Sequence, residues 1–149
     1  MRVVVQRVSM SKVTVNNEII GSINKGLNLL VGISNEDTIS DLQYMKDKIL
    51  NLRIFEDENE KMNKSVLDIQ GEILAISQFT LYGDIRGGRR PNFMKAMKGD
   101  LARDLFDTFV KMLSESQLKI ETGEFGAYMK VDIINDGPCT ILIDSKKEF

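Results

Sequence analysis

The start of the chain decides the fold class, because apolar and polar residues alternate there in four consecutive segments. These segments are "RVVVQRV" (2–8), "KVTVNN" (12–17), "EIIGSI" (18–23) and "GLNLLVGIS" (26–34). A period of two is typical of half-buried β-strands. Turn-forming residues, Asn16-Asn17 and Asn24-Lys25-Gly26, separate most of the segments. The region is therefore predicted to be an antiparallel meander.

The period changes in "SNEDTISDLQYMKDKILNLRIF" (34–55), where apolar residues recur every three or four positions. This pattern predicts an amphipathic helix on which Ile39, Leu42, Met45, Ile49 and Leu52 recur at helical spacing, with Asn35 or Asp37 as its N-cap. A second helix is predicted from about Asp100 to Ser114, with an apolar face made by Leu101, Leu105, Phe109 and Met112 or Leu113.

Further strands are predicted within "GEILAISQFTLYGD" (71–84) and "QLKIETGEFGAYMKVDIINDGPCTILIDS" (117–145). No repeat, linker or low-complexity segment divides the 149 residues. We therefore expect a single α+β domain over residues 1–149, in which curved, barrel-like antiparallel sheets carry two packed helices.

Composition excludes several kinds of site. The chain has no histidine and one cysteine, so it has no Ser-His-Asp or Cys-His arrangement, no His-ligated metal, no structural zinc and no internal disulfide. The single cysteine fits a reducing cytoplasm. No apolar run approaches the roughly 20 residues of a membrane helix. The net charge of −2 does not predict binding to nucleic acid, DNA included, through bulk electrostatics.

The charge distribution is less even than this sum suggests. The segment "IRGGRRPNFMKAMKG" (85–99) contains no acidic residue, and its five basic residues are Arg86, Arg89, Arg90, Lys95 and Lys98. Two interpretations remain open: a solvated loop, or a local phosphate-binding patch on an otherwise acidic protein.

Three short stretches are candidates for chemistry. In "SQFTLYG" (77–83), Ser77 or Thr80 would need an activating base to act as a nucleophile, and none is evident; strand-end turn chemistry is the alternative. A cysteine nucleophile needs a nearby cation to activate its thiol, and Cys139 has none beside it in sequence. We therefore interpret Cys139 as a small buried hydrophobe. Gly137-Pro138 interrupts a β-like run, either as a hairpin turn or as a cis peptide.

Several motifs together resemble one family along the whole chain. They are the opening "MRVVVQRV" (1–8), "SQFTLYGD" (77–84), "GRRPNF" (88–93), "TGEFGAYMKV" (122–131) and "NDGPCT" (135–140). In kind and order they resemble the bacterial D-aminoacyl-tRNA deacylases. The chain differs at Cys139, where the family usually has valine, and at "KAMKGD" (95–100), which is more basic than usual.

The resemblance implies a homodimer without metal or cofactor that hydrolyses the ester between a D-amino acid and the 3′ end of tRNA, and also clears mischarged glycyl-tRNA. It implies that Gly137-Pro138 is a cis peptide that enters the partner's pocket and excludes L-amino acids. Arg7 would hold this motif by hydrogen bonding. Stiff main chain suits this role, because exclusion by steric clash does not depend on which side chain the substrate carries.

For catalysis, the resemblance implies that the 2′-hydroxyl of the terminal adenosine helps to activate water. Main-chain donors of Phe79 and Thr80 would stabilise the oxyanion, while Ser77 and Gln78 shape the pocket. Met129, with Phe79, would pack near the adenine, and a separate set would meet tRNA phosphates: Arg86, Arg89 and Arg90. Three alternatives stay open: a non-catalytic dimer that binds tRNA 3′ ends or nucleotides, a conventional Ser or Thr hydrolase, and a purely structural dimer.

Overall fold

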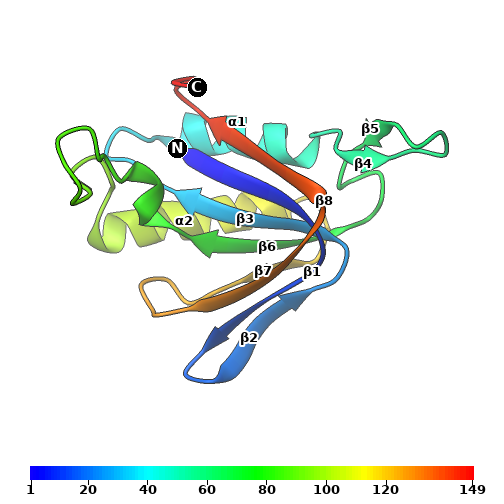
Figure 1. Ribbon diagram of the computed structural model, residues 1–149, viewed down its shortest axis with the longest axis horizontal. Coiled ribbons are helices and arrows are strands. Elements are labelled where there is room, and N and C mark those ends of the chain that lie inside the picture. The colour runs from blue at the N-terminus through cyan, green and yellow to red at the C-terminus, as the bar shows by residue number, and fades with distance from the viewer.

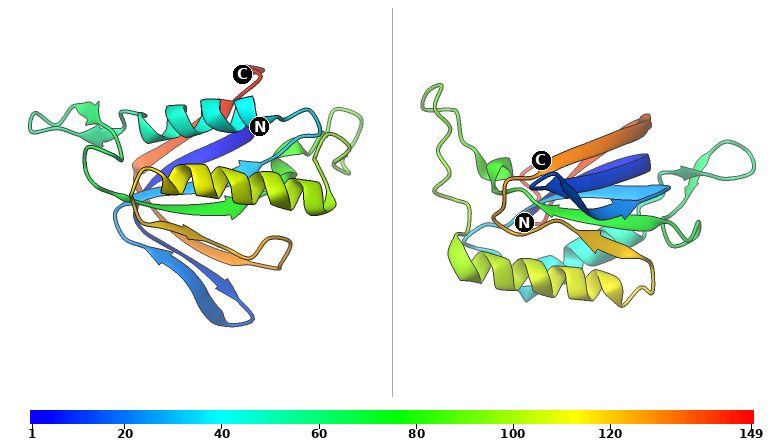
Figure 2. Two further views of the ribbon diagram at one scale, coloured as in Figure 1. Left: turned by 180° about the vertical axis from the view of Figure 1, so that it is seen from behind. Right: turned by 90° about the horizontal axis from the view of Figure 1, so that it is seen from below.

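The computed structural model describes residues 1–149 and shows a strongly curved sheet with two helices packed on one face (Figures 1 and 2). The elements in chain order are β1 (Arg2–Val15), β2 (Glu18–Ile23), β3 (Gly26–Gly32), α1 (Ile39–Leu50), β4 (Phe55–Glu56), β5 (Met62–Lys64), β6 (Glu72–Ser77), the 3₁₀ helix η1 (Phe79–Tyr82), α2 (Gly99–Ser114), β7 (Ile120–Thr122) and β8 (Lys130–Asp144). No helix is long and apolar enough to cross a membrane.

Strand β1 organises the sheet. Its first half pairs with β3, its second half pairs with β2, and β8 runs antiparallel along both halves. The predicted simple meander is therefore wrong, because β2 and β3 each pair with β1 and not with one another. The alternating segments at 2–8 and 12–15 form one long strand, with register shifts near Val8 where the pairing with β8 is irregular.

Two pairings, β3 with β6 and β6 with β7, are parallel, so the sheet is mixed and not antiparallel throughout. Parallel neighbours require a crossover connection, and here the first connection contains α1 and the second contains α2. The far ends of the sheet nearly meet, since a Cβ on Gly21 of β2 would lie 2.8 Å from the carbonyl oxygen of Thr122 in β7. The expectation of an α+β domain with a barrel-like sheet and two helices is confirmed.

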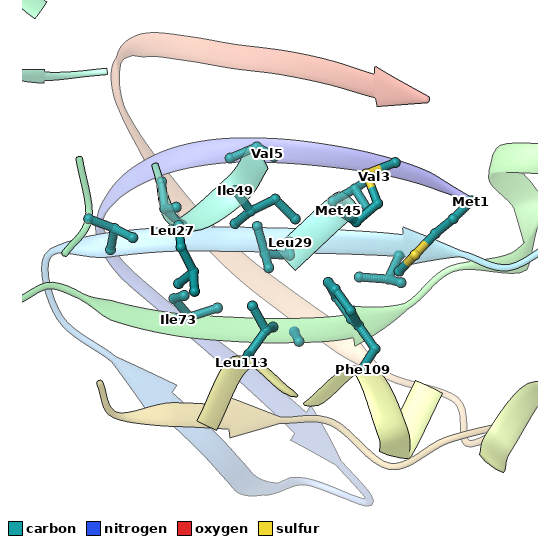
Figure 3. Packing of buried hydrophobic residues seen from close by; sticks show 14 of the residues in the cluster. Met1, Val3, Val5, Leu27, Leu29, Met45, Ile49, Ile73, Phe109 and Leu113 are labelled. Atoms are coloured by element: carbon teal, nitrogen blue, oxygen red, sulfur yellow. The ribbon is translucent and has the colours of Figure 1, made fainter. Parts of the chain in front are cut away.

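The larger core lies between the sheet and the helices, as Figure 3 shows. Val3 and Val5 of β1 and Leu27 and Leu29 of β3 face α1 and α2 there. A smaller cluster made by Val8, Val13, Ile23, Leu74 and Ile76 fills the inside of the curled sheet. The two clusters explain why strand residues on both faces of β6 are buried.

The helices differ in detail from the pattern-based expectation. The N-cap of α1 is Thr38, not Asn35 or Asp37, and the carboxylate of Asp41 accepts hydrogen bonds from the Thr38 N–H at 2.9 Å and the Thr38 hydroxyl at 3.0 Å. Asp37 is instead buried against the amino group of Met1 and the N–H of Ser34.

The predicted span of α2 is nearly exact, but its predicted face is rotated. Phe109 and Leu113 are buried as predicted, but Leu101 is 70% exposed, and the other two buried positions are Ala102 and Phe106. This set follows the same spacing of three and four residues, so the period alone did not select the face. The rotation matters because two of the buried residues line the cavity described next.

Candidate active site

A cavity of about 270 Å³ opens where β6 ends and the chain turns into η1. Four residues that the resemblance assigned to the site line it: Ser77, Gln78, Phe79 and Met129. The remaining wall is mostly apolar and includes residues of α2 and of the loop between β7 and β8 that the sequence analysis did not assign: Ala102, Phe106, Phe125 and Tyr128. The motif "TGEFGAYMKV" covers the loop residues but did not single them out.

Backbone geometry at the cavity leaves two donors free. The Gln78 N–H donates to the carbonyl oxygen of Val31 at 2.7 Å, which continues the pairing between β6 and β3 by one residue. Phe79 and Thr80 then begin η1, where the first N–H groups of a helix have no partner within the helix. Neither N–H donates to any other acceptor in the chain. The site therefore offers two adjacent unpaired N–H groups beside an apolar cavity.

Thr80 is not arranged as a nucleophile. Its hydroxyl accepts a hydrogen bond from Nε2 of Gln78 at 2.5 Å, and its side chain does not line the cavity. Ser77 does line the cavity and is partly buried. No carboxylate or lysine is among the lining residues, and Tyr128 is their only titratable member. The chain thus places no general base beside either hydroxyl.

Aromatic and sulfur-containing side chains define the mouth and wall. The ring of Phe79 meets the ring of Phe93 edge to face, with centroids 5.1 Å apart. Met129 lies over Gly123, where a Cβ would collide with the methionine sulfur. Phe125 packs against Phe106 of α2 at 5.9 Å between centroids. These contacts join the cavity mouth to the basic loop through Phe93 and to α2 through Phe106.

Arg7 is buried in β1 and reaches the Gly-Pro segment of β8. Its Nε donates to the carbonyl oxygen of Asp136 at 2.8 Å, and its Nη1 donates to the carbonyl oxygen of Ile54 at 2.6 Å. The Gly137-Pro138 peptide is cis. Both residues are exposed, and neither lines the cavity. The fold therefore brings Arg7 to this motif and keeps the motif apart from "SQFT".

The hydrogen bonds around the motif leave little freedom. The Cys139 N–H donates to Oδ1 of Asn135 at 2.7 Å, which closes the chain across Gly137 and Pro138, and the Asn135 side-chain amide donates to the Thr140 hydroxyl at 2.8 Å. Cys139 is buried in the larger core, as expected of a small hydrophobe. Gly137 has φ of +138°, and a Cβ there would lie 2.7 Å from Nη2 of Arg7.

The basic segment is an exposed loop in which the arginines differ. Arg86 is paired with Asp84, through Nε at 2.9 Å and Nη2 at 2.5 Å, and hydrogen bonds from the side chain and backbone of Arg86 hold the pKa of Asp84 well below its usual range. Arg89 and Arg90 are exposed and make no hydrogen bond or ion pair within the chain. Their charges are available to a ligand, whereas that of Arg86 is largely neutralised.

Comparisons with known proteins identify the family of this chain. The sequence model of the family described as "D-Tyr-tRNA(Tyr) deacylase" matches residues 4–144. The chain is 68% identical to a "D-aminoacyl-tRNA deacylase" of Clostridium perfringens and 64% identical to one of Clostridium botulinum, in each case over 149 residues and 100% of both chains.

Among solved structures, one named "c-Myc DNA Unwinding Element Binding Protein" superposes with a TM-score of 0.91 at 47% identity, covering 97% of this chain and 98% of the other. A second, described as "Structural Analysis of a probable eukaryotic D-amino acid tRNA deacylase", has a TM-score of 0.82 at 17% identity over 95% and 97% of the two chains, and shows the shared fold. The chain belongs to the D-Tyr-tRNA(Tyr) deacylase family.

Proposed function

We propose that this protein is a D-aminoacyl-tRNA deacylase, an enzyme that hydrolyses the ester between a D-amino acid and the 3′ end of tRNA. Family membership supports the reaction class. The observation that carries the assignment is the pair of unpaired N–H groups of Phe79 and Thr80, next to a cavity of about 270 Å³. Such donors stabilise the oxyanion that forms when water attacks an ester.

The chain supplies no base, so we propose that the RNA contributes one of the reacting groups. In this proposal the 2′-hydroxyl of the terminal adenosine helps to activate the attacking water, while the main chain binds the developing negative charge. An aminoacyl ester is already activated, and each tenfold acceleration requires about 1.4 kcal/mol. The absence of a carboxylate or lysine from the cavity lining supports this division of roles.

We propose that stereochemical selection is made by exclusion across a homodimer. Gly137 and Pro138 do not line the cavity of their own protomer, but they are exposed and thus accessible to a second copy. Exposed apolar residues on the same strand, Ile134 and Leu142, supply surface that a second copy would cover. Main chain in the partner's cavity would clash with the side chain of any L-amino acid. Glycine has no side chain to reject, so glycyl-tRNA would also be hydrolysed.

In the same proposal Arg7 is a positioning residue, since it binds the carbonyl oxygen directly before Gly137. Arg89 and Arg90 would contact tRNA phosphates, with a smaller contribution from Arg86 because Asp84 neutralises it. Ser77, Gln78, Phe79 and Met129 would contact the terminal adenosine and the aminoacyl group.

The decisive experiment compares release of amino acid from D-Tyr-tRNA, Gly-tRNA and L-Tyr-tRNA by the purified protein. The proposal expects the first two to be deacylated much faster than the third, which should stay at the spontaneous rate. Equal release from D-Tyr-tRNA and L-Tyr-tRNA would exclude selection by exclusion. Background release from all three would exclude the enzyme assignment.

A non-catalytic module that binds tRNA 3′ ends or other nucleotides is the second candidate. The observation in its favour is that the solved structure with 47% identity is named as a DNA-binding protein. The net charge of −2 gives no general affinity for nucleic acid. Under this alternative, RNA ending in CCA would bind with no turnover of D-Tyr-tRNA, so the same assay separates the two functions.

A further inference from the structure

Tyr128 is both strongly exposed and part of the cavity lining. It is 86% exposed, more than any other large apolar side chain of the protein, and it lines the cavity at the end of β6. Tyrosine is enriched at contact surfaces, because its ring is apolar while its hydroxyl can stay hydrated. The proposed function uses the N–H groups of Phe79 and Thr80 and the Gly137-Pro138 motif, and it assigns no role to the Tyr128 ring.

The loop that carries Tyr128 is anchored. Its turn is closed by a hydrogen bond from the Ala127 N–H to the carbonyl oxygen of Glu124 at 3.2 Å, and Gly126 has the positive φ of +80° that the turn requires. Phe125 packs on Phe106 of α2, and Met129 lies over Gly123. The backbone that carries Tyr128 is therefore already ordered, so a ligand that stacks on the ring has only the side chain to immobilise.

A free positive charge lies beside this loop. The guanidinium of Arg103, on the second turn of α2, is 5.7 Å above the ring of Phe125. Arg103 makes no hydrogen bond or ion pair within the chain. Figure 2 shows the loop before β8 next to the start of α2. The lip of the cavity therefore presents an aromatic face and an unpaired guanidinium.

This chemistry favours single-stranded RNA over a second copy of the chain. Aromatic rings that stack with bases and arginines that contact phosphates are how proteins bind unpaired nucleotides. An apolar protein surface would leave the Arg103 charge without a partner. A cavity of about 270 Å³ lies just below the usual size range of ligand sites, so it leaves no room for a second nucleotide beside a terminal nucleoside.

We propose that Tyr128 and Arg103 form a subsite for the nucleotide that precedes the terminal adenosine: Tyr128 stacks on its base, and Arg103 binds its phosphate. The subsite rests on the proposed function, because the terminal adenosine must occupy the cavity. It would align the RNA before the ester reaches Phe79 and Thr80, and it would act on substrate binding and not on the chemical step.

The test uses two substrates that differ only in this nucleotide and the RNA beyond it: D-Tyr-tRNA, and adenosine esterified with D-tyrosine. Tyr128→Ala should raise KM for D-Tyr-tRNA about tenfold, in line with the loss of one base–aromatic stack. Its kcat, and its kcat/KM for the D-tyrosyl adenosine, should stay within about twofold of wild type. Tyr128→Phe should restore KM, because the ring stacks without its hydroxyl. Arg103→Ala should raise KM for D-Tyr-tRNA alone and weaken its salt dependence.

Matched controls remove comparable groups elsewhere. Ile39→Ala deletes an exposed apolar side chain at the start of α1, and Lys111→Ala deletes a charge in the last turn of α2; both should leave KM unchanged. Equal losses on both substrates would overturn the proposal, since Tyr128 would then contact the adenosine or the amino acid. An unchanged KM in Tyr128→Ala would also overturn it.

A binding measurement keeps this test separate from the proposed function. The anisotropy of a fluorescein-labelled, single-stranded RNA ending in CCA reports affinity without turnover. Tyr128→Ala should weaken this binding about tenfold, and Tyr128→Phe should not. If wild-type protein released no amino acid but the variants still showed this pattern, the reaction would be wrong and the subsite correct. If deacylation were normal and the pattern absent, the subsite would be wrong.

Discussion

The guanidinium of Arg7 binds the carbonyl oxygen of Asp136 at 2.8 Å, and so joins the middle of β1 to the residue directly before Gly137. The second acceptor of this buried charge is also a carbonyl oxygen, that of Ile54 at 2.6 Å. Arg7 has no carboxylate partner, so its hydrogen bonds fix backbone and do not neutralise charge. A change at Arg7 should therefore act on the position of the segment 136–138.

Arg7→Lys should lower stereochemical discrimination more than it lowers activity. Lysine keeps the charge but cannot donate in two fixed directions, so one of the two carbonyl oxygens loses its partner at a cost of about 1–3 kcal/mol in unfolding free energy. We expect the ratio of kcat/KM for D-Tyr-tRNA to that for L-Tyr-tRNA to fall by about tenfold or more. An unchanged ratio in a folded variant would show that Arg7 is only structural.

Thr80→Ala should retain most of the deacylase activity. The Thr80 hydroxyl is hydrogen bonded to Gln78 and has no base beside it, whereas the proposed contribution of this residue is its main-chain N–H, which alanine keeps. We expect kcat to remain within about tenfold, because one neutral hydrogen bond contributes about 1 kcal/mol. Complete loss of activity, together with a normal thermal transition, would instead favour a conventional threonine hydrolase.

The sequence was most informative where local chemistry decides the structure. Asn16 and Asn17 have positive φ values of 49° and 66°, as a tight hairpin between β1 and β2 requires, and α2 begins and ends within one residue of the prediction. The face of α2 was predicted only in part: Phe109 and Leu113 are buried as expected, but Leu101 and Ala102 are on neighbouring rows of one helix, and only packing against the sheet chooses between them.

In the candidate site, too, residues within local motifs were predicted, and residues brought in by the packing of distant segments were not. Ser77, Gln78, Phe79 and Met129 were assigned through motifs and do line one cavity. Phe106 and Tyr128 come from two elements that are far apart in sequence, and only the parallel pairing of β6 with β7 brings them to the end of β6. Strand direction depends on crossover connections and not on alternation, so period-two patterns did not predict it.

Replacing Arg89 and Arg90 together by alanine should raise KM for tRNA and weaken its dependence on salt. Each lost phosphate contact lowers the slope of log affinity against log salt by about 0.7–0.9. Arg86→Ala is the matched control: Asp84 already neutralises that charge, so its effect on the slope should be smaller. Initial rates at several salt concentrations measure both. Equal slopes for wild type and the double variant would place the tRNA elsewhere.

The contribution of Asp41 to the free energy of unfolding should be lost below about pH 4. Burial alone would raise the pKa of its carboxyl, but hydrogen bonds from Lys146, Ser145 and Thr38 outweigh burial and hold the pKa well below its usual range. A lowered pKa means that the stabilisation is fully present above the unfolded-state value of about 4 and is lost as the pH falls below it.

Asp41→Asn should accordingly lower the unfolding free energy by about 1–3 kcal/mol at pH 7, and the gap to wild type should narrow below about pH 4. Denaturant titrations at several pH values measure this gap. Asp104→Asn, at an exposed position of α2, is the control and should change little at any pH. A gap that stayed constant down to pH 2 would show that ionisation of Asp41 does not contribute.

Gly26→Ala should destabilise the fold far more than the same change at Gly87. A Cβ on Gly26 would overlap the carbonyl group of Glu72 and lie 2.6 Å from its backbone nitrogen, where β3 and β6 begin their parallel pairing. The Glu72 backbone cannot move aside, because it is held in the pairing of β6 with β3, so we expect a loss of about 3 kcal/mol or more in unfolding free energy. Gly87 lies in the exposed basic loop with no atom within 4 Å of an added Cβ, and its substitution should cost less than about 0.5 kcal/mol. Thermal unfolding of the two variants side by side measures the difference.

Similar unfolding midpoints for the two variants would mean that β3 and β6 do not approach this closely at Gly26. The positions of Val31 and Ile76, which line the cavity from these two strands, would then also be wrong.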